Sequence, residues 1–376
     1  MPEKKRQHYL PKFLLKHFSI EGNDKQINIY NITNDNAISS ASLKEQAAEN
    51  YFYGKDGVIE ENFGKVEAEA AKVFKEIMEE KLPPHNSSKH STILFFTLTL
   101  GARTLYKADE QVELMNKLMK KIASLDSKLK DHLDEFEIKV ENPLSMSLKA
   151  VATSLPLAID LKYKLLVNKT KIPFIVSDNP VSYYNNFLED RKKIGSNIGI
   201  AVKGLQIFLP ISPLHQIIFY DSAVYKVNGA KQNVIELKND NDTLSLNGLQ
   251  FLNSNLNIYY NDKFCSANLK TLKNNYDKYR RGKKTNLSEY REINSTKDVP
   301  NVLLQFYAED IKCKLNLSFI KILKKAKGYD LGNKLIHLRN ENLVRIHREF
   351  SDVVDERKYK PMEFNNFLLD KYKSAT

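Results

Sequence analysis

The spacing of apolar residues predicts helices over much of the first 170 residues. Six apolar positions between residues 60 and 81 repeat at intervals of three and four, as on one face of an amphipathic helix: Phe63, Val66, Ala70, Val73, Phe74 and Ile77. The same spacing predicts helices over residues 91–122, 126–138 and 144–167, with a kink at Pro156. We therefore expect a helical layer between residues 60 and 167.

From Ile172 onward, the pattern changes to short apolar runs that end in prolines or polar residues. Runs of this kind predict buried strands at residues 172–176, 205–209 and 216–220. The corner Pro210-Ile211-Ser212-Pro213 joins the last two runs and favours an antiparallel pair. The expected fold class is α+β, in which the helical layer packs on a small, mainly antiparallel sheet.

The pattern of the last third is less regular. It predicts a helix over residues 239–260, a strand over 302–307 and a helix over 315–325. Residues 263–376 hold 25 Lys and Arg against 14 Asp and Glu, whereas residues 1–262 are nearly balanced. We expect a core over residues 1–265 and a basic α/β region over residues 266–376 that packs on it.

Composition narrows the protein class. The 376 residues are 42% hydrophobic and 28% charged, and no apolar run is long enough for a membrane helix, so we expect a soluble protein without a membrane partner. Cys265 and Cys313 are the only cysteines, which favours a reducing cytoplasm. The Walker A, GxGxxG, HExxH and GxSxG patterns are absent, and no nucleotide cofactor is expected.

Four short segments carry a resemblance to a known family. They are Gln7-His8-Tyr9-Leu10-Pro11-Lys12, Arg103 at the end of an apolar run, Ser177-Asp178-Asn179-Pro180, and the corner at residues 210–213. In this order they resemble the domain of unknown function 4238 family, over roughly residues 5–265. The resemblance implies one fold and a shared polar site, and it implies no activity.

The polar residues of these segments form a candidate site. The set comprises His8, Lys12, Glu67, Arg103, Asp178 and Asn179. His8, Glu67 and Asp178 are the candidate catalytic residues and metal ligands, because a histidine with carboxylates can hold a divalent ion such as Mg²⁺ or Mn²⁺ and polarise a phosphodiester. Lys12, Arg103 and Asn179 are candidates for binding the substrate. We expect His8 and Asp178 to lie in one cleft.

Structural roles compete with these functional ones. Asp178-Asn179-Pro180 is also typical of a turn, and His8 alone is also typical of a structural histidine. Arg103, close to apolar residues, needs a carboxylate partner, for which Asp178 and Glu67 are the candidates. Four other histidines lack metal-ligand spacing and are expected at the surface: His85, His90, His337 and His347.

Two hypotheses about function remain. The first is a nucleic-acid-processing enzyme, such as a metal-dependent nuclease acting as a toxin or in anti-phage defence. Its partner would be RNA or single-stranded DNA, bound by a basic, tyrosine-rich loop that contains Arg280, Arg281, Lys283 and Lys284. The second is a non-catalytic binding or regulatory module with a structural polar network, whose basic third binds a protein partner.

Overall fold

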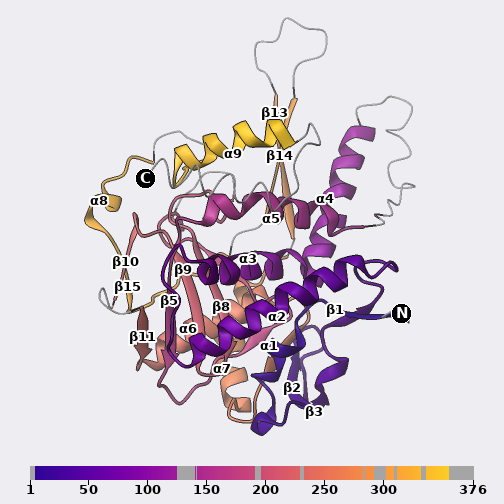
Figure 1. Ribbon diagram of the computed structural model, residues 1–376, viewed down its shortest axis with the longest axis vertical. Coiled ribbons are helices and arrows are strands. Elements are labelled where there is room, and N and C mark those ends of the chain that lie inside the picture. Colours follow the sequence, from indigo (N-terminus) through magenta and orange to yellow (C-terminus); the bar gives the residue numbers. More distant parts are fainter. Residues whose placement is uncertain are drawn as a thin grey trace, which may run out of the picture.

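The centre of the fold is a five-stranded sheet (Figure 1). The computed structural model describes residues 5–124, 140, 142–190, 196–228, 233–282, 284–291, 302–308, 311–331 and 336–354. In spatial order, the strands of the sheet are β11 (Val234–Leu237), β5 (Lys162–Asn168), β9 (His215–Tyr220), β8 (Gln206–Ser212) and β7 (Ser182–Tyr184). β11 and β5 are parallel, and the other neighbouring pairs are antiparallel. The expected α+β class with a mainly antiparallel sheet is confirmed.

Both faces of this sheet are buried, which explains why its strands have continuous apolar runs. In β8, Ile207 and Leu209 pack into a core on the side of the N-terminal helices, whereas Phe208 packs into a second core on the opposite side. Ile217 and Ile218 of β9 divide in the same way. Successive side chains of a strand point to opposite faces, so a strand covered on both sides needs apolar residues at every position.

Helices cover the two faces. One core contains residues of α1 (Lys12–Lys16), α2 (Val58–Met78), α3 (Ser88–Ala102) and α5 (Ser145–Ala158), and Figure 1 shows α2 and α3 running across this face. The other contains residues of α6 (Asp240–Asn253) and α7 (Ser266–Tyr276). The helix predicted over residues 60–81 corresponds to α2. The stretch 91–122 is divided between α3 and α4 (Leu105–Ala123), with Thr104 as N-cap of α4.

A second sheet holds the N-terminal strands. Its order is β3 (Asn36–Ser42), β2 (Gln26–Asn31), β12 (Asn257–Tyr260) and β6 (Val176–Ser177), and all its pairs are antiparallel. Three further pairs are β1 (Arg6–His8) with β4 (Ala48–Asn50), β10 (Tyr225–Val227) with β15 (Ile320–Ile322), and β13 (Thr285–Arg291) with β14 (Val302–Ala308).

Four of the expected elements differ from the structure. Residues 162–167 and 257–260, expected at the ends of helices, are strands β5 and β12. The run at residues 172–176 contributes only its last residue to the two-residue strand β6. Residues 315–325 contain β15 and the start of the four-residue helix α8 (Lys324–Lys327) instead of a longer helix. The 126–138 helix lies outside the described residues.

The C-terminal region packs on the same core as the N-terminal region. Leu272 of α7 and Phe319 share a buried cluster with Ile258 of β12. The helix α9 (Glu341–Val354) lies along α5, and the β13–β14 hairpin projects beside α4 (Figure 1). The division at residue 265 and the basic extension stay predictions. Within the described part of the chain, no helix has both the length and the apolar character needed to cross a membrane.

Candidate functional site

A cleft of about 560 Å³ lies between the N-terminal segment and α2. We call it the N-terminal cleft and define it by its lining residues: Arg6, His8, Lys12, Phe13, Glu60, Gly64, Glu67, Ala68 and Ala71. The five residues of α2 recur at intervals of one, three and four and so form one face of the helix. Three of these five are glycine or alanine, which leaves the space of the cleft open. The structure thus brings His8, Lys12 and Glu67 together.

Strand β1 presents His8 to this cleft. Its neighbours Gln7 and Tyr9 are buried, and the Gln7 side chain accepts a hydrogen bond from the Tyr53 amide (2.6 Å) and donates one to the Gly54 carbonyl (2.8 Å). Because side chains alternate along a strand, His8 points away from this anchored side. The buried neighbours hold the backbone, and the histidine remains half-buried at the surface of the cleft.

The imidazole of His8 is neutral and has a defined tautomer. Its Nδ1 lies 3.1 Å from the carbonyl oxygen of Gln46, an acceptor, so Nδ1 carries the hydrogen and Nε2 carries the lone pair. Burial first, and then the charge of Lys12, lower the pKa of His8 from 6.5 to about 4. At neutral pH, His8 Nε2 is therefore able to accept a proton, a hydrogen bond or a metal ion.

The partner of Arg103 is Glu67. Nη2 of Arg103 lies 2.6 Å from Oε1 of Glu67, and the guanidinium carbon lies 4.6 Å from the centre of the Phe63 ring. The Arg103 side chain is 2% exposed and that of Glu67 is 26% exposed. Arg103 therefore lies behind the residues that line the cleft. It holds the Glu67 carboxylate in place but does not line the cleft itself.

Asp178 lies outside the N-terminal cleft, contrary to the expectation that it shares one with His8. Its side chain is buried, and its two oxygens accept hydrogen bonds from the amides of Asn255 (2.7 Å), Leu256 (2.8 Å) and Asn257 (2.9 Å). Burial raises the pKa of the Asp178 carboxyl, while the three amide hydrogen bonds oppose that shift. Asp178 thus joins its own segment to the start of β12, a contact that is longer in range than a local turn, and its catalytic role stays a prediction.

The whole Ser177-Asp178-Asn179-Pro180 segment is held by amide side chains of α6. Asn247 and Gln250 accept hydrogen bonds from the backbone amides of Ile175 (3.2 Å) and Ser177 (3.0 Å). One turn further along α6, the Asn253 side chain donates to the backbone carbonyls of Asn179 and Val181. These three residues at intervals of three satisfy a buried backbone that makes little strand pairing.

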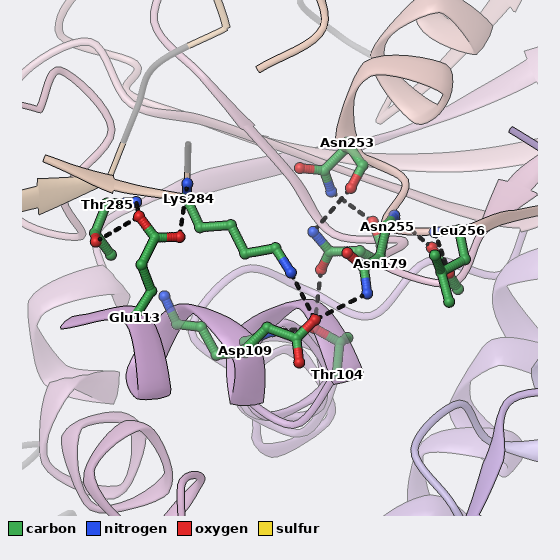
Figure 2. Close-up of polar contacts among 11 residues, drawn as sticks. Thr104, Asp109, Glu113, Asn179, Asn253, Asn255, Leu256, Lys284 and Thr285 are labelled. Carbon is green, nitrogen blue, oxygen red and sulfur yellow. Dashed lines mark hydrogen bonds and ion pairs between the residues drawn. The ribbon is translucent and has the colours of Figure 1, made fainter. Parts of the chain in front are cut away.

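Asn179 belongs to the same network. Its side chain donates a hydrogen bond to the backbone carbonyl of Asn253 (3.0 Å) and accepts one from the Thr104 hydroxyl (3.1 Å), as Figure 2 shows. Thr104 is also the N-cap of α4. Asn179 therefore connects α4 to α6 and is not exposed to a substrate in the N-terminal cleft.

The expected metal set does not converge. Nε2 of His8 and the Glu67 carboxylate line the cleft, but Asp178 is absent from it and its oxygens are occupied by backbone amides. Among the residues that the structure describes, no group of three or more His, Cys, Asp or Glu side chains could hold a metal ion. His8, Glu67 and Asp178 therefore do not lie together as one set of metal ligands.

The basic loop makes intramolecular contacts. Arg280 donates to the Phe251 carbonyl (3.2 Å) and the Ser254 hydroxyl (3.3 Å) at the C-terminus of α6. Arg281 donates to the Asn253 side chain (3.0 Å), and Lys284 forms an ion pair with Asp109.

Figure 2 shows the ion pair between Lys284 and Asp109. Asp109 also accepts a hydrogen bond from the Asn255 side chain (3.3 Å). Lys283 lies outside the described residues. The three described cations thus attach the loop to α4 and α6, and their role in binding nucleic acid stays a prediction.

Several residues of these sites are not among those predicted from the sequence. Arg6 and Glu60 also line the cleft, and the spacing of residue 60 from Glu67 on one helix face could have indicated Glu60. The polar spacing Asn247, Gln250, Asn253 within an apolar helix could have indicated the α6 network. His90 and His337, expected at the surface, are 0% and 1% exposed, because His90 stacks on Tyr163 inside the core and His337 packs against Tyr329.

Comparison with known proteins gives one match. The model of a family described as protein of unknown function (DUF4238) matches residues 6–264. This range contains the whole N-terminal cleft, the Asp178 segment and α6, and it ends before the basic loop. No match was found among the curated proteins or among the solved structures.

Proposed function

The chain belongs to the DUF4238 family, whose function is unknown. From the geometry of the N-terminal cleft, we propose that the protein processes nucleic acid. The cleft would bind a phosphate group, and His8 would accept a proton there. The single observation that carries this proposal is the neutral His8 of defined tautomer between two cationic side chains in an open cleft.

The cations of the cleft support binding of a phosphate. Lys12 is exposed, and it makes no ion pair with any residue in the described ranges. Arg6 pairs with Glu45 at 3.3 Å, but both side chains are about half exposed, and such surface pairs exchange readily with another anion. Arg103 behind the wall offsets the charge of Glu67. A phosphate can therefore approach Lys12 and Arg6 without facing an uncompensated Glu67 carboxylate.

RNA is the substrate class that these residues suit best. In RNA, the 2′-hydroxyl supplies the nucleophile, so a proton acceptor and cations beside the phosphate are the groups that the protein must provide. Nε2 of His8 would take the 2′-hydroxyl proton as the 2′-oxygen bonds to phosphorus. The bond from phosphorus to the 5′-oxygen then breaks, and that oxygen takes a proton from water. The hydroxide left behind takes the proton from Nε2 of His8, which returns to its neutral form. The products are a 2′,3′-cyclic phosphate and a free 5′-hydroxyl.

A specific observation favours a second candidate, a non-catalytic binding module. The Asp178 and Asn179 side chains, and the Arg103–Glu67 pair, are engaged in contacts that hold the fold together. In such a module the N-terminal cleft would recognise a phosphate-bearing partner without chemistry. The two candidates differ in whether bound RNA is cleaved.

We expect His8→Ala to reduce RNA cleavage by about 100-fold, because a positioned general base contributes about that factor or more. Lys12→Ala should weaken RNA binding about tenfold, since it removes one charge-assisted phosphate contact. The assay follows a labelled single-stranded RNA and its 2′,3′-cyclic phosphate product, with and without Mg²⁺. Lys16→Ala is the matched control, because Lys16 is on the same short helix but pairs with Asp24 at 3.2 Å.

The outcomes separate the two candidates. Cleavage that is lost in His8→Ala and retained in Lys16→Ala supports the enzyme. RNA binding that depends on Lys12 without any cleavage supports the binding module. If the protein neither binds nor cleaves RNA, or if Lys12→Ala and Lys16→Ala behave alike, the proposal fails.

Anion binding should also raise the pKa of His8. Burial and the positive charge of Lys12 hold this pKa at about 4, and a bound phosphate would offset the Lys12 contribution. As the pH is lowered from neutral, His8 should therefore become protonated at a higher pH in the complex than in the free protein. The measurement is an NMR titration of the His8 ring with and without a single-stranded DNA oligonucleotide, which has phosphates but no 2′-hydroxyl. Lys12→Met should raise the pKa of the free protein, and an unchanged pKa in both experiments would contradict the assignment.

A further inference from the structure

The Glu67 carboxylate keeps one oxygen for a ligand in the N-terminal cleft. Its Oε1 accepts the hydrogen bond from Nη2 of Arg103 at 2.6 Å, and Glu67 forms no other hydrogen bond with the residues that the structure describes. The Glu67 side chain is 26% exposed and lines the cleft. Its second oxygen, Oε2, is therefore an acceptor for an N–H or O–H group of a bound molecule, and hydrogen bonds to a carboxylate are stronger than those between neutral groups.

Arg103 fixes the direction of this acceptor. The guanidinium is buried and packs on the Phe63 ring, so the Glu67 carboxylate is held by a partner that is itself held. A side chain ordered in advance loses little entropy when a ligand binds, and it favours a donor at one position. Glu60, the other carboxylate of the cleft, lies seven residues earlier on α2, which is about 10 Å along the helix. The two carboxylates therefore face different parts of a bound molecule.

Phe13 gives the cleft an aromatic wall. The centre of its ring lies 6.0 Å from that of Phe74 and 5.6 Å from that of Phe96, and both of these rings are buried. The two core rings hold Phe13 in place, and its half-buried side chain also lines the cleft. Aromatic side chains beside cations stack nucleic-acid bases of any sequence, because every base has a π-face. The cleft thus combines cations for a phosphate, an aromatic wall for a base and one fixed acceptor.

We infer that Glu67 makes the N-terminal cleft selective for bases that carry an exocyclic amino group, which donates a hydrogen bond to Glu67 Oε2. This inference rests on the proposed binding of nucleic acid in the cleft. Cytosine has an amino donor at position 4, whereas uracil has an oxygen acceptor there, which would face the carboxylate with lone pairs on both sides. Lys12 and Phe13 contribute affinity for any nucleotide, and Glu67 decides between bases.

Binding of short DNA single strands to the full-length protein tests this selectivity. Strands of deoxycytidine and deoxyuridine have the same backbone and no 2′-hydroxyl, so binding is measured without cleavage. By fluorescence anisotropy in slightly alkaline buffer, where cytosine is unprotonated, we expect the cytosine strand to bind about tenfold more tightly. A strand of 2-pyrimidinone, which lacks the amino group but keeps the N3 acceptor of cytosine, should also bind about tenfold more weakly than cytosine. Phe13→Leu should weaken binding of all three strands by a similar factor.

Glu67→Gln tests the role of the carboxylate. The amide oxygen of the new side chain would turn toward Arg103, a donor, so that its NH₂ group would face the base. This group repels the cytosine amino group and donates to the uracil oxygen, so the preference should reverse. In Arg103→Met with Glu67→Gln no buried charge remains and the amide is free to turn, so the preference should disappear. Glu60→Gln is the matched control, since Glu60 lines the same cleft on the same helix, and it should keep the cytosine preference.

A blocking variant tests the location. Gly64 lines the cleft, and a Cβ atom added there has no heavy atom within 4 Å. Gly64→Leu should therefore fill the cleft without a clash and abolish binding of every strand, with thermal unfolding at or above the wild-type temperature. Asn62→Leu is the control, because Asn62 is exposed on the same helix but does not line the cleft.

The outcomes separate this inference from the proposed function. A cytosine preference that reverses in Glu67→Gln, disappears in the double variant and persists in Glu60→Gln supports the inference. Equal binding of the cytosine and uracil strands, equal binding of the cytosine and 2-pyrimidinone strands, or the same preference in both glutamine variants overturns it and leaves the proposed function standing. If no strand binds, or if Gly64→Leu and Asn62→Leu bind alike, the binding of nucleic acid in the cleft fails as well.

Discussion

Replacing Asp178 with asparagine is expected to lower the free energy of unfolding by about 3 kcal/mol. The two carboxylate oxygens accept three backbone hydrogen bonds, of which Oδ2 accepts those from Leu256 and Asn257. An asparagine has only one accepting oxygen, so its NH₂ group would face at least one of these amides. The buried amide would then lack a partner, and a donor would oppose a donor.

Chemical denaturation followed by circular dichroism measures this loss. Asp262→Asn is the control, because Asp262 also accepts a backbone amide, that of Glu21 at 3.0 Å, but at the exposed surface. Water can replace the lost acceptor there, and the effect should be much smaller. Equal stability of Asp178→Asn and the wild-type protein would show that Asp178 does not hold β12 as described.

Replacing Glu67 with glutamine is expected to lower the free energy of unfolding by about 3 kcal/mol, because it leaves the charge of Arg103 buried. Arg103 is 2% exposed, and its Nε already lacks a hydrogen-bond partner within the described ranges. The cation would retain the Phe63 ring, 4.6 Å away, but lose its carboxylate. A cation over an aromatic ring recovers only part of that loss.

A double-mutant cycle separates this pair from the helix itself. Arg103→Met removes the buried charge while retaining an apolar stem, so Glu67→Gln should cost much less in the Arg103→Met background. Glu69→Gln is the control on the same helix, since Glu69 pairs with Lys72 where both side chains are about two-thirds exposed. Additive effects of the two substitutions would contradict the ion pair as the main role of Arg103.

Secondary structure was predictable where a local pattern decides it. Helix α2 follows from its stripe of apolar residues, which is visible from Phe63 to Ile77 without knowledge of any partner. The hairpin of β8 and β9 follows from two apolar runs around the Pro210–Pro213 corner. In contrast, Leu165 to Val167 belong to strand β5 although their pattern predicts a helix, because consecutive apolar residues in a strand buried on both faces do not show a period of two.

The candidate site was predictable only in part, because some of its contacts depend on long-range packing. His8, Lys12 and Glu67 meet in the N-terminal cleft, and Arg103 has one of its two expected carboxylate partners. The choice between Glu67 and Asp178 depended on which helix packs beside the end of α3. That packing is a long-range property of the core.

The sequence by itself determined the elements with a strong local period, the α+β class and the family to which the chain belongs. Only the tertiary structure decided that Asp178 supports the fold while His8 faces a cleft. Both are polar residues in short motifs, and their types and neighbours along the chain are compatible with either role. The role depends on what lies opposite: three backbone amides saturate Asp178, whereas an open cleft beside Lys12 leaves Nε2 of His8 able to accept a proton.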